Sequence, residues 1–250
     1  MKLKKIQFDE KVPLTSHLGE IRFRLIRVII LLSVVFVICF YLSESILDII
    51  RKPISGYNLV FLSPTEAFFA HLKLGFFTAL ALTIPFILYH LWEFISPGLK
   101  IKEKKHTLPF VILSTISFIS GALFAYFLIL PFGLGFLLKY KTNALTPNIT
   151  IGNYIGFAFR LILVFGIIFE LPLIIFFLTK IGIVKPTMLT KNRKYAILII
   201  FIASAILTPP DVVTQILMAI PLIFLYEISV IGCRVAFRKK QTEKESASGG

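Results

Sequence analysis

Long apolar runs dominate this chain of 250 residues and restrict it to a small set of folds. The runs lie at residues 25–43, 66–94, 108–138, 154–179, 195–208 and 212–232. A helix needs about 20 apolar residues to cross the hydrocarbon core of a bilayer. Charged residues make up only 16% of the chain, against about 25% in soluble domains. The runs therefore predict an all-α integral membrane protein with six transmembrane helices.

The lengths of the runs differ, and the differences carry structural predictions. The second and third, near 30 residues, must tilt, kink or project from the bilayer. The fifth has about 14 residues, so it forms with the sixth either a short spanning hairpin or a re-entrant one. We expect one membrane domain at residues 1–232. Residues 233–250 are expected to be a polar cytoplasmic tail, disordered or partly foreign to the natural chain.

Positive charge is distributed unevenly between the connections. Most of the 27 lysines and arginines fall in four segments, at residues 1–27, 95–107, 180–194 and 233–250. Cytoplasmic loops of membrane proteins carry an excess of these residues, so both termini are predicted to be cytoplasmic. This bias accounts for the net charge of +14 without nucleic acid as a partner. Attraction to anionic lipid is a further expected consequence.

No pattern of a catalytic centre is present in the sequence. It lacks a nucleotide-binding loop, a metal-ligand spacing and a nucleophile with its base. Cys39 and Cys233 lie far apart in the chain and are interpreted as small apolar residues. We therefore expect no enzyme, no cofactor and no metal site, and a function based on binding within a membrane.

Glu170 is the unusual residue within the apolar runs, because no other charge occurs between residues 161 and 178. An acid at such depth costs about 2.5–3.5 kcal/mol on insertion scales and usually faces a protein interior or a wet cavity. Arg160 is ten residues away, about 15 Å along a helix, and is too distant to pair with it. Thr208 and Gln215, near the short hairpin, are the candidate partners. A structural hydrogen-bonding role for Glu170 remains an alternative.

Two other acids precede or follow apolar runs within basic surroundings. Glu20 comes before the first run, near Arg22 and Arg24, and Glu103 stands among lysines in the connection 95–107. Taken singly, each is more simply explained as a solvated surface charge. Together they predict a cytoplasmic surface that could bind a ligand with paired cations, because arginine–carboxylate pairs are strong and can be bidentate.

Five stretches of the chain resemble the TatC family, the large integral subunits of the twin-arginine protein translocase. They are SHLGEIRFRL at 16–25, LYHLWEFISPGL at 88–99, GALFAYFLILPFGLGFL at 121–137, FGIIFELPL at 165–173 and ILTPPDVVTQILMAIPLIFLYEISV at 206–230. Each stretch alone is weakly specific. Their order, their spacing and the charge pattern make the resemblance specific over about residues 12–232.

The resemblance implies a fold and a function. The fold would be a concave, glove-like six-helix bundle with short fifth and sixth helices. The function would be that of a receptor in the bacterial-type cytoplasmic (inner) membrane. It would bind twin-arginine signal peptides of folded precursor proteins and nucleate the translocase. Expected partners are single-span subunits of the TatB and TatA types and further copies of the chain.

The resemblance also implies roles for individual residues. Signal-peptide binding is expected at Glu20, Arg22, Phe94 and Glu103. An intramembrane polar cluster, where a partner helix docks, is expected at Glu170, Thr208 and Gln215. Two further positions of the outer loops match the family, Pro53 and Asp211.

Two alternatives belong to other functional classes. An ion-coupled transporter would use Glu170 as a proton carrier, but such proteins show repeats and paired broken helices, and the sequence has no visible repeat. A purely structural membrane scaffold would tolerate the loss of Glu20 and Glu103.

Overall fold

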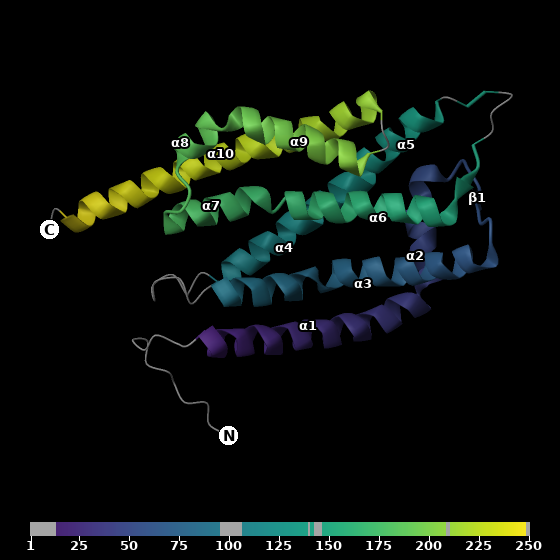
Figure 1. Cartoon of the computed structure of the whole chain (residues 1–250), viewed down its shortest axis with the longest axis horizontal. Coiled ribbons are helices and arrows are strands. Elements are labelled where there is room, and N and C mark those ends of the chain that lie inside the picture. The colour runs from purple at the N-terminus through teal and green to yellow at the C-terminus, as the bar shows by residue number, and fades with distance from the viewer. Residues whose placement is uncertain (1–13, 96–106, 140, 143–146, 209–210, 249–250) are drawn as a thin grey trace, which may run out of the picture.

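The computed structural model of the chain describes all residues except 1–13, 96–106, 140, 143–146, 209–210 and 249–250. The first half comprises α1 (Leu14–Tyr41), α2 (Ser43–Ile50), the 3-10 turn η1 (Lys52–Ile54), β1 (Leu59–Val60), α3 (Pro64–Ile95) and α4 (Thr107–Phe124). The second half comprises the π-helical η4 (Ala125–Ile129), α5 (Leu130–Leu138), β2 (Ile149–Thr150), α6 (Ile151–Ile168), α7 (Leu171–Ile181), α8 (Pro186–Lys191), α9 (Arg193–Leu207) and α10 (Val212–Ser248). Long helices run back and forth in this bundle (Figure 1).

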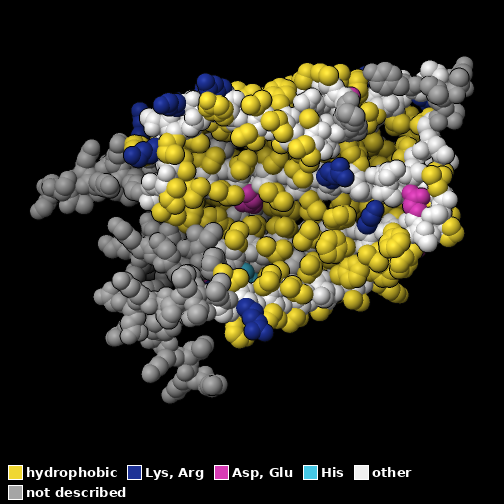
Figure 2. Space-filling view, in the orientation of Figure 1, with side chains coloured by type: hydrophobic (Ala, Val, Ile, Leu, Met, Phe, Trp, Pro, Cys, Tyr) yellow, Lys and Arg dark blue, Asp and Glu magenta, His cyan; other side chains and the backbone are white. Residues whose placement is uncertain are grey.

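Five helical segments are long and apolar enough to cross a membrane. They span Ile21–Tyr41, Pro64–Glu93, Leu108–Leu138, Ile151–Ile181 and Val212–Arg238. α9 has 15 residues, about 22 Å of helix, and is the short element expected before the last span. Figure 2 shows an exterior covered largely by hydrophobic side chains, as a lipid-facing surface requires. The prediction of an all-helical membrane protein is confirmed.

Two prolines interrupt the long spans. Pro172 lies in the first turn of α7, where its missing N–H and the clash of its ring with the preceding turn favour a break in the helix. α6 therefore ends at Ile168 and α7 begins at Leu171, which leaves Glu170 in the break. Pro131 follows the π-helical segment η4, where one wider turn absorbs the disturbance. Pro85 and Pro221 lie inside α3 and α10, which continue through them.

α6 is the centre of the packing. Its buried side chains include Tyr154, Ile155 and Phe165, and α3 and α4 both pack against it. The approach of α4 to α6 depends on two glycines. A Cβ at Gly121 would lie 2.5 Å from the backbone oxygen of Phe165, and one at Gly166 would lie 2.4 Å from the Phe118 ring. Small residues of this kind let membrane helices approach closely.

α1 and α9 occupy the edges of the bundle. α1 packs chiefly against α3, and the two backbones come close at Gly75, where a Cβ would lie 2.9 Å from the Cα of Phe40. α9 packs mainly against α10. Many apolar side chains of both edge helices are exposed, among them Phe23, Val37, Leu198 and Ile199. These faces suit contact with lipid or with another membrane helix.

The two ends of the bundle differ in charge and in structure. α1 begins, α3 ends, α4 begins and α10 ends at one end, which lies at the left of Figure 1 together with the connection from α7 to α9. We call it the basic end, because the described cations of this connection and of α10 lie there. They are Lys180, Lys185, Lys191, Arg193, Lys194, Arg234 and Arg238. The opposite end carries α2, η1 and the parallel pair of β1 with β2.

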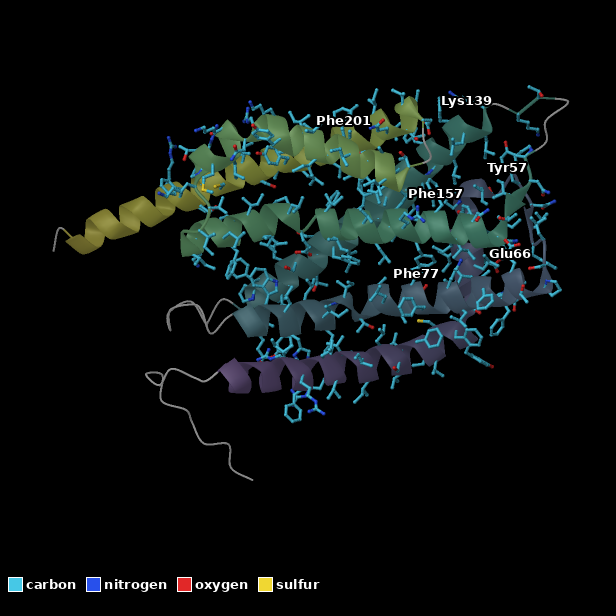
Figure 3. All side chains as sticks on the ribbon, in the orientation of Figure 1. Tyr57, Glu66, Phe77, Lys139, Phe157 and Phe201 are labelled. Carbon is cyan, nitrogen blue, oxygen red and sulfur yellow. The ribbon has the colours of Figure 1, made fainter. Side chains whose placement is uncertain are left out.

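Glu66 organises the opposite end, as Figure 3 shows at the start of α3. The Glu66 backbone N–H donates to Ser63 Oγ at 3.3 Å, and its Oε2 accepts from the Leu62 backbone N–H at 2.8 Å. Its Oε1 accepts from the backbone N–H of Gly152 at 3.1 Å. The first two bonds form an N-terminal cap of α3 close to a capping box, and the third joins the starts of α3 and α6.

The last helix is longer than the apolar run that predicted it. α10 continues to Ser248, so residues 233–248, which we expected to form a polar tail, are helical. Lysine, glutamate, glutamine and alanine are frequent there, and all of them favour helix without requiring burial. α10 as a whole has 37 residues, of which the candidate span Val212–Arg238 comprises 27.

Candidate functional site

The first candidate site lies at the basic end, where α1 and α3 are neighbours. Arg24 of α1 donates from Nη1 to Glu93 Oε2 of α3 at 2.8 Å and to the backbone oxygen of His90 at 3.2 Å. The Arg24 side chain is only 14% exposed, while that of Glu93 is 43% exposed. This partly buried ion pair holds the first turns of α1 beside the last turn of α3.

The residues expected to bind the signal peptide belong to the same two helices and to the connection that follows α3. Glu20 lies on α1 one turn before Arg24, and Phe94 follows Glu93 on α3. Arg22 is an exposed side chain of α1. The side chains of Glu20 and Phe94, and residue 103 as a whole, lie outside the described part of the structure. The helices thus bring the backbone positions of residues 20 and 94 to one end, and Glu103 belongs to the connection that leaves α3 there.

The second candidate site is the carboxyl of Glu170, inside the bundle. Glu170 is 5% exposed and precedes the first turn of α7 without capping it through its side chain. The α4 groups near its carboxyl are the Ser114 side chain and the backbone of Phe118. Among the described residues its Oε1 atom has no hydrogen-bond partner. One carboxylate oxygen is therefore buried and unsatisfied, which costs free energy unless a further group binds it.

The partners that we expected for Glu170 bond elsewhere. Thr208 donates from Oγ1 to the backbone oxygen of Ser204 at 2.9 Å, within α9. Gln215 of α10 donates from Nε2 to the backbone oxygen of Phe201 at 3.1 Å, which joins α10 to α9. Phe201 is labelled in Figure 3. Neither contacts Glu170 through any described hydrogen bond. The Gln215 bond thus connects the two helices of the α9–α10 hairpin, while Thr208 bonds the last turn of α9, which it follows.

Ser114 is a buried polar residue near Glu170 that sequence reasoning missed. Its Oγ accepts a hydrogen bond of 3.0 Å from the Nε1 of Trp92, and the Ser114 side chain is fully buried. The Trp92 ring in turn stacks on Phe110 and meets Phe177 edge-on, with ring centroids 5.2 Å and 4.5 Å apart. Ser114 is a polar residue within an apolar run, and the same kind of position drew attention to Glu170, so the sequence could have indicated Ser114 as well. The sequence does not reveal which helix such a serine faces.

The two outer-loop positions that match the family, Asp211 and Pro53, each lie in an ordered local structure. Asp211 Oδ1 accepts from the Thr214 backbone N–H at 2.7 Å, and Oδ2 accepts from the Thr214 hydroxyl, so Asp211 caps the start of α10. Pro53 lies in η1 and is partly buried. The backbone before it is held by Tyr126 and Tyr154, whose hydroxyls donate to the carbonyl oxygens of residues 49 and 50.

Within the described residues no group of three histidine, cysteine or acidic side chains could hold a metal ion. The chain matches the family described as Sec-independent protein translocase protein (TatC) over residues 16–221.

The chain belongs to the TatC family. It is 45% identical over 245 residues to the TatC protein of Desulforapulum autotrophicum, covering 96% of this chain and 91% of that protein. It is 42% identical over 236 residues to the Aquifex aeolicus TatC protein, covering 92% of this chain and 98% of that protein. The resemblance seen in the sequence is thereby confirmed.

Solved structures agree with these relatives. A crystal structure of the twin arginine translocase receptor TatC, in the detergent DDM, superposes with a TM-score of 0.79 at 42% identity. The match covers 86% of this chain and 98% of that one. A second crystal structure of this receptor superposes with a TM-score of 0.78 at 41% identity, covering 88% of this chain and 99% of that one. TatC relatives are components of a protein translocase, so this multi-pass membrane protein is a transport component and not an enzyme.

Proposed function

We propose that this protein is the receptor of the twin-arginine translocation pathway, which binds signal peptides of folded precursors and nucleates the translocase. The ion pair of Arg24 with Glu93 is the observation that carries the site's location. It supports a binding surface at the basic end, built from the start of α1 and the end of α3 with the connection that follows. Glu20, Arg22, Phe94 and Glu103 are its proposed members.

The chemistry of these residues suits a peptide with two consecutive arginines. Each guanidinium presents parallel N–H donors that match a carboxylate oxygen pair, and lysine lacks this fork. Glu20 and Glu103 would each receive one arginine. Phe94 offers an aromatic ring, on which a guanidinium or an apolar signal residue packs. Arg22 is a nearby cation that would favour the ionised form of these acids, the form that binds a guanidinium.

Partner docking is proposed for the intramembrane residues. The buried, unpartnered oxygen of Glu170 supports a place where a polar group of a single-span TatB-like or TatA-like subunit binds. Thr208 and Gln215 would act through the α9–α10 hairpin. We expect a TatB-like subunit to co-purify with the wild type and to be lost from Glu170→Ala. Retention by that variant would refute docking at Glu170.

The protein is proposed to reside in a bacterial-type cytoplasmic membrane with both termini inside, and to associate with further copies of itself. The basic end would then face anionic lipid headgroups. A pocket of about 470 Å³ there supports this, because Arg234 and Arg238 line it together with apolar Ile231 and Val235. The lipid proposal is tested by comparing the stability of the protein in nanodiscs with and without phosphatidylglycerol. Arg234→Gln should reduce the stabilisation of the folded protein by this anionic lipid.

The decisive experiment measures signal-peptide binding by the purified protein in nanodiscs. A fluorescent peptide with two consecutive arginines is compared with its twin-lysine variant. We expect the arginine peptide to bind more tightly, and Glu20→Gln and Glu103→Gln each to weaken it. Losing one charged partner of a hydrogen-bonded pair costs about 1.5–3 kcal/mol, or about 10- to 100-fold in Kd.

A matched control distinguishes the site from general electrostatics. Glu44→Gln removes an exposed acid of α2 at the opposite end and changes the net charge equally. Its Kd should equal that of the wild type. Equal affinity for both peptides, or equal losses in all three variants, would reject the receptor proposal and favour a structural scaffold.

A further inference from the structure

Two exposed cations lie inside membrane-spanning helices. Lys73 is the only lysine or arginine of α3, and Arg160 is the only one of α6. Each lies nine residues, about 14 Å of helix, after the first residue of its candidate span. Both residues are exposed, and Figure 2 shows dark-blue side chains within the yellow face over these two helices. A cation in such a position is costly in hydrocarbon unless an anion or water meets it.

α3 and α6 pack against each other and run in the same direction from the opposite end of the bundle (Figure 1). Near their starts, Glu66 Oε1 accepts from the backbone N–H of Gly152 at 3.1 Å. Lys73 follows Glu66 by seven residues, about 10 Å of helix. Arg160 follows Gly152 by eight residues, about 12 Å of helix. Counted from this contact, the two cations lie at nearly the same depth.

A second contact between the same helices lies further along them. The rings of Phe77 and Phe159 stack there, with centroids 5.4 Å apart. Lys73 lies four residues before Phe77, about 6 Å of helix. Arg160 follows Phe159 directly, about 1.5 Å beyond it. The two contacts together place the cations within about 2–8 Å of each other in depth, on packed helices whose axes are usually about 8–10 Å apart.

Lys73 belongs to the row of α3 that faces α6. Residues four and seven apart share one face of a helix, and both Phe77 and Glu66, which contact α6, stand at these distances from Lys73. The two Glu66 oxygens accept from backbone N–H groups, at residues 62 and 152. Within the described part of the chain, neither Lys73 nor Arg160 forms an ion pair or a hydrogen bond. Both cations are therefore available to a ligand.

The surroundings of the cations combine open space with apolar surface. Gly156 lies one turn before Arg160 on the same side of α6, and a Cβ there would have no packing neighbour within 4 Å. Phe69 and Phe76 flank Lys73 at helical spacing and are 55% and 41% exposed. A ligand with an anionic head and apolar chains suits this face, because the head meets the cations while the chains lie along the rings.

We propose that Lys73 and Arg160 together bind the phosphate of a phospholipid, in the leaflet at the opposite end of the bundle. Arginine pairs with phosphate through two parallel N–H donors, and lysine binds it as a point charge. This lipid site is distinct from the pocket at Arg234, which lies at the basic end. It is independent of the proposed receptor function.

Depth favours a lipid as the occupant. The two spans have 30 and 31 residues, about 45 Å of helix, while the hydrocarbon core is about 30 Å thick. Spans centred on that core would place Lys73 and Arg160 about 6 Å inside its edge. Long cationic side chains extend from such a depth to the headgroups. Every bilayer supplies phosphate there, so the protein alone can satisfy both cations, without a partner helix.

The test counts the lipids bound to the delipidated full chain in detergent by native mass spectrometry. Phosphatidylglycerol is titrated beside galactosyl diacylglycerol, which has no phosphate, and glycerol phosphate, which has no acyl chains. We expect phosphatidylglycerol alone to fill this site. Lys73→Gln/Arg160→Gln should bind one molecule fewer than the wild type at a concentration that saturates the wild type. The apparent Kd at this site should rise at least about 10-fold.

Lys52→Gln/Lys139→Gln is the matched control. It removes two exposed cations at the opposite end, outside the candidate spans, and changes the net charge equally. Its lipid count should equal that of the wild type. Two further variants alter the site without removing a charge. Arg160→Lys should retain the lipid more tightly than the double glutamine variant, and Gly156→Leu, which fills the space beside Arg160, should weaken binding.

Three outcomes would overturn the lipid site. The first is an equal count of phosphatidylglycerol on the wild type and on Lys73→Gln/Arg160→Gln, or, if that variant does not fold, on Gly156→Leu. The second is an equal loss in the matched control, which would indicate general electrostatics. The third is unchanged lipid binding together with the loss of a co-purifying TatB-like subunit, which would assign this face to an acidic partner helix.

Discussion

Arg24 and Glu93 show what one residue pair contributes to this protein. The pair joins α1 to α3, and α1 otherwise presents much apolar surface outward. Because Arg24 is mostly buried, we expect its coupling to Glu93 to reach the upper part of the range for ion pairs, about 1 kcal/mol. A double-mutant cycle with Arg24→Gln and Glu93→Gln, read from unfolding in mixed micelles, measures it. Additive effects of the two substitutions would contradict a direct pair.

Glu170 shows which features of a single residue can be predicted from sequence. An isolated acid in an apolar run can be recognised from sequence as a candidate functional residue, because burial of a charge is costly in any fold. Its neighbours cannot, since they depend on which face of α4 meets α6. We expected Thr208 and Gln215, while Ser114 of α4 lies near the carboxyl. The break beside Glu170 is different, because Pro172 favours it, although α3 and α10 continue through Pro85 and Pro221.

At the scale of elements, close helix approach decides which glycines matter. At Gly121 an added Cβ would meet backbone of α6, which cannot rotate away. Gly121→Ala should therefore destabilise the protein by about 1–3 kcal/mol, as overpacking does. Gly232 of α10 has no such neighbour, so Gly232→Ala should be neutral or stabilise by up to about 1 kcal/mol. Thermal unfolding in detergent compares them, and equal effects would exclude the packing explanation.

The start of α3 is an element boundary that its residues explain. Ser63 is followed by Glu66 three positions later, the pattern of a capping box, and α3 begins at Pro64. The bond from Gly152 to Glu66 was not predictable, because it depends on α6 starting beside α3. The end of α10 illustrates the reverse case. A polar segment was interpreted as a tail, although its residues have good helix propensity and simply extend a helix already formed.

Glu66 should hold the starts of two helices together. In Glu66→Ala the backbone N–H groups of Leu62 and Gly152 both lose their acceptor. We expect faster hydrogen exchange at these two amides and a lower melting temperature, with signal-peptide affinity unchanged. Glu44→Ala, at an exposed position of α2, is the control and should leave both amides as protected as in the wild type. Unchanged exchange in Glu66→Ala would show that the cap does not stabilise these helices.

For the molecule as a whole, the uneven charge of its two ends is the main physical asymmetry. The basic end also holds the proposed peptide site, and the opposite end holds the Glu66 cap and the strand pair. Precursors are made inside the cell, so a receptor needs its acids there. Lysine and arginine excess predicts the same orientation by an independent route. Both arguments therefore predict that a measurement of topology will place the basic end inside the cell.

Single cysteines at the two ends measure that orientation. In a Cys39→Ala/Cys233→Ser background, Ser55→Cys lies at the opposite end and Lys191→Cys at the basic end, both at exposed positions. Serine at 233 keeps an acceptor for the Thr179 hydroxyl, which bonds Cys233 Sγ at 3.0 Å. A membrane-impermeant maleimide added to intact spheroplasts should label Ser55→Cys alone. Lys191→Cys should react only after the membrane is opened. Labelling of Lys191→Cys in intact cells would place the basic end outside, where the proposed peptide site could not meet a precursor before export.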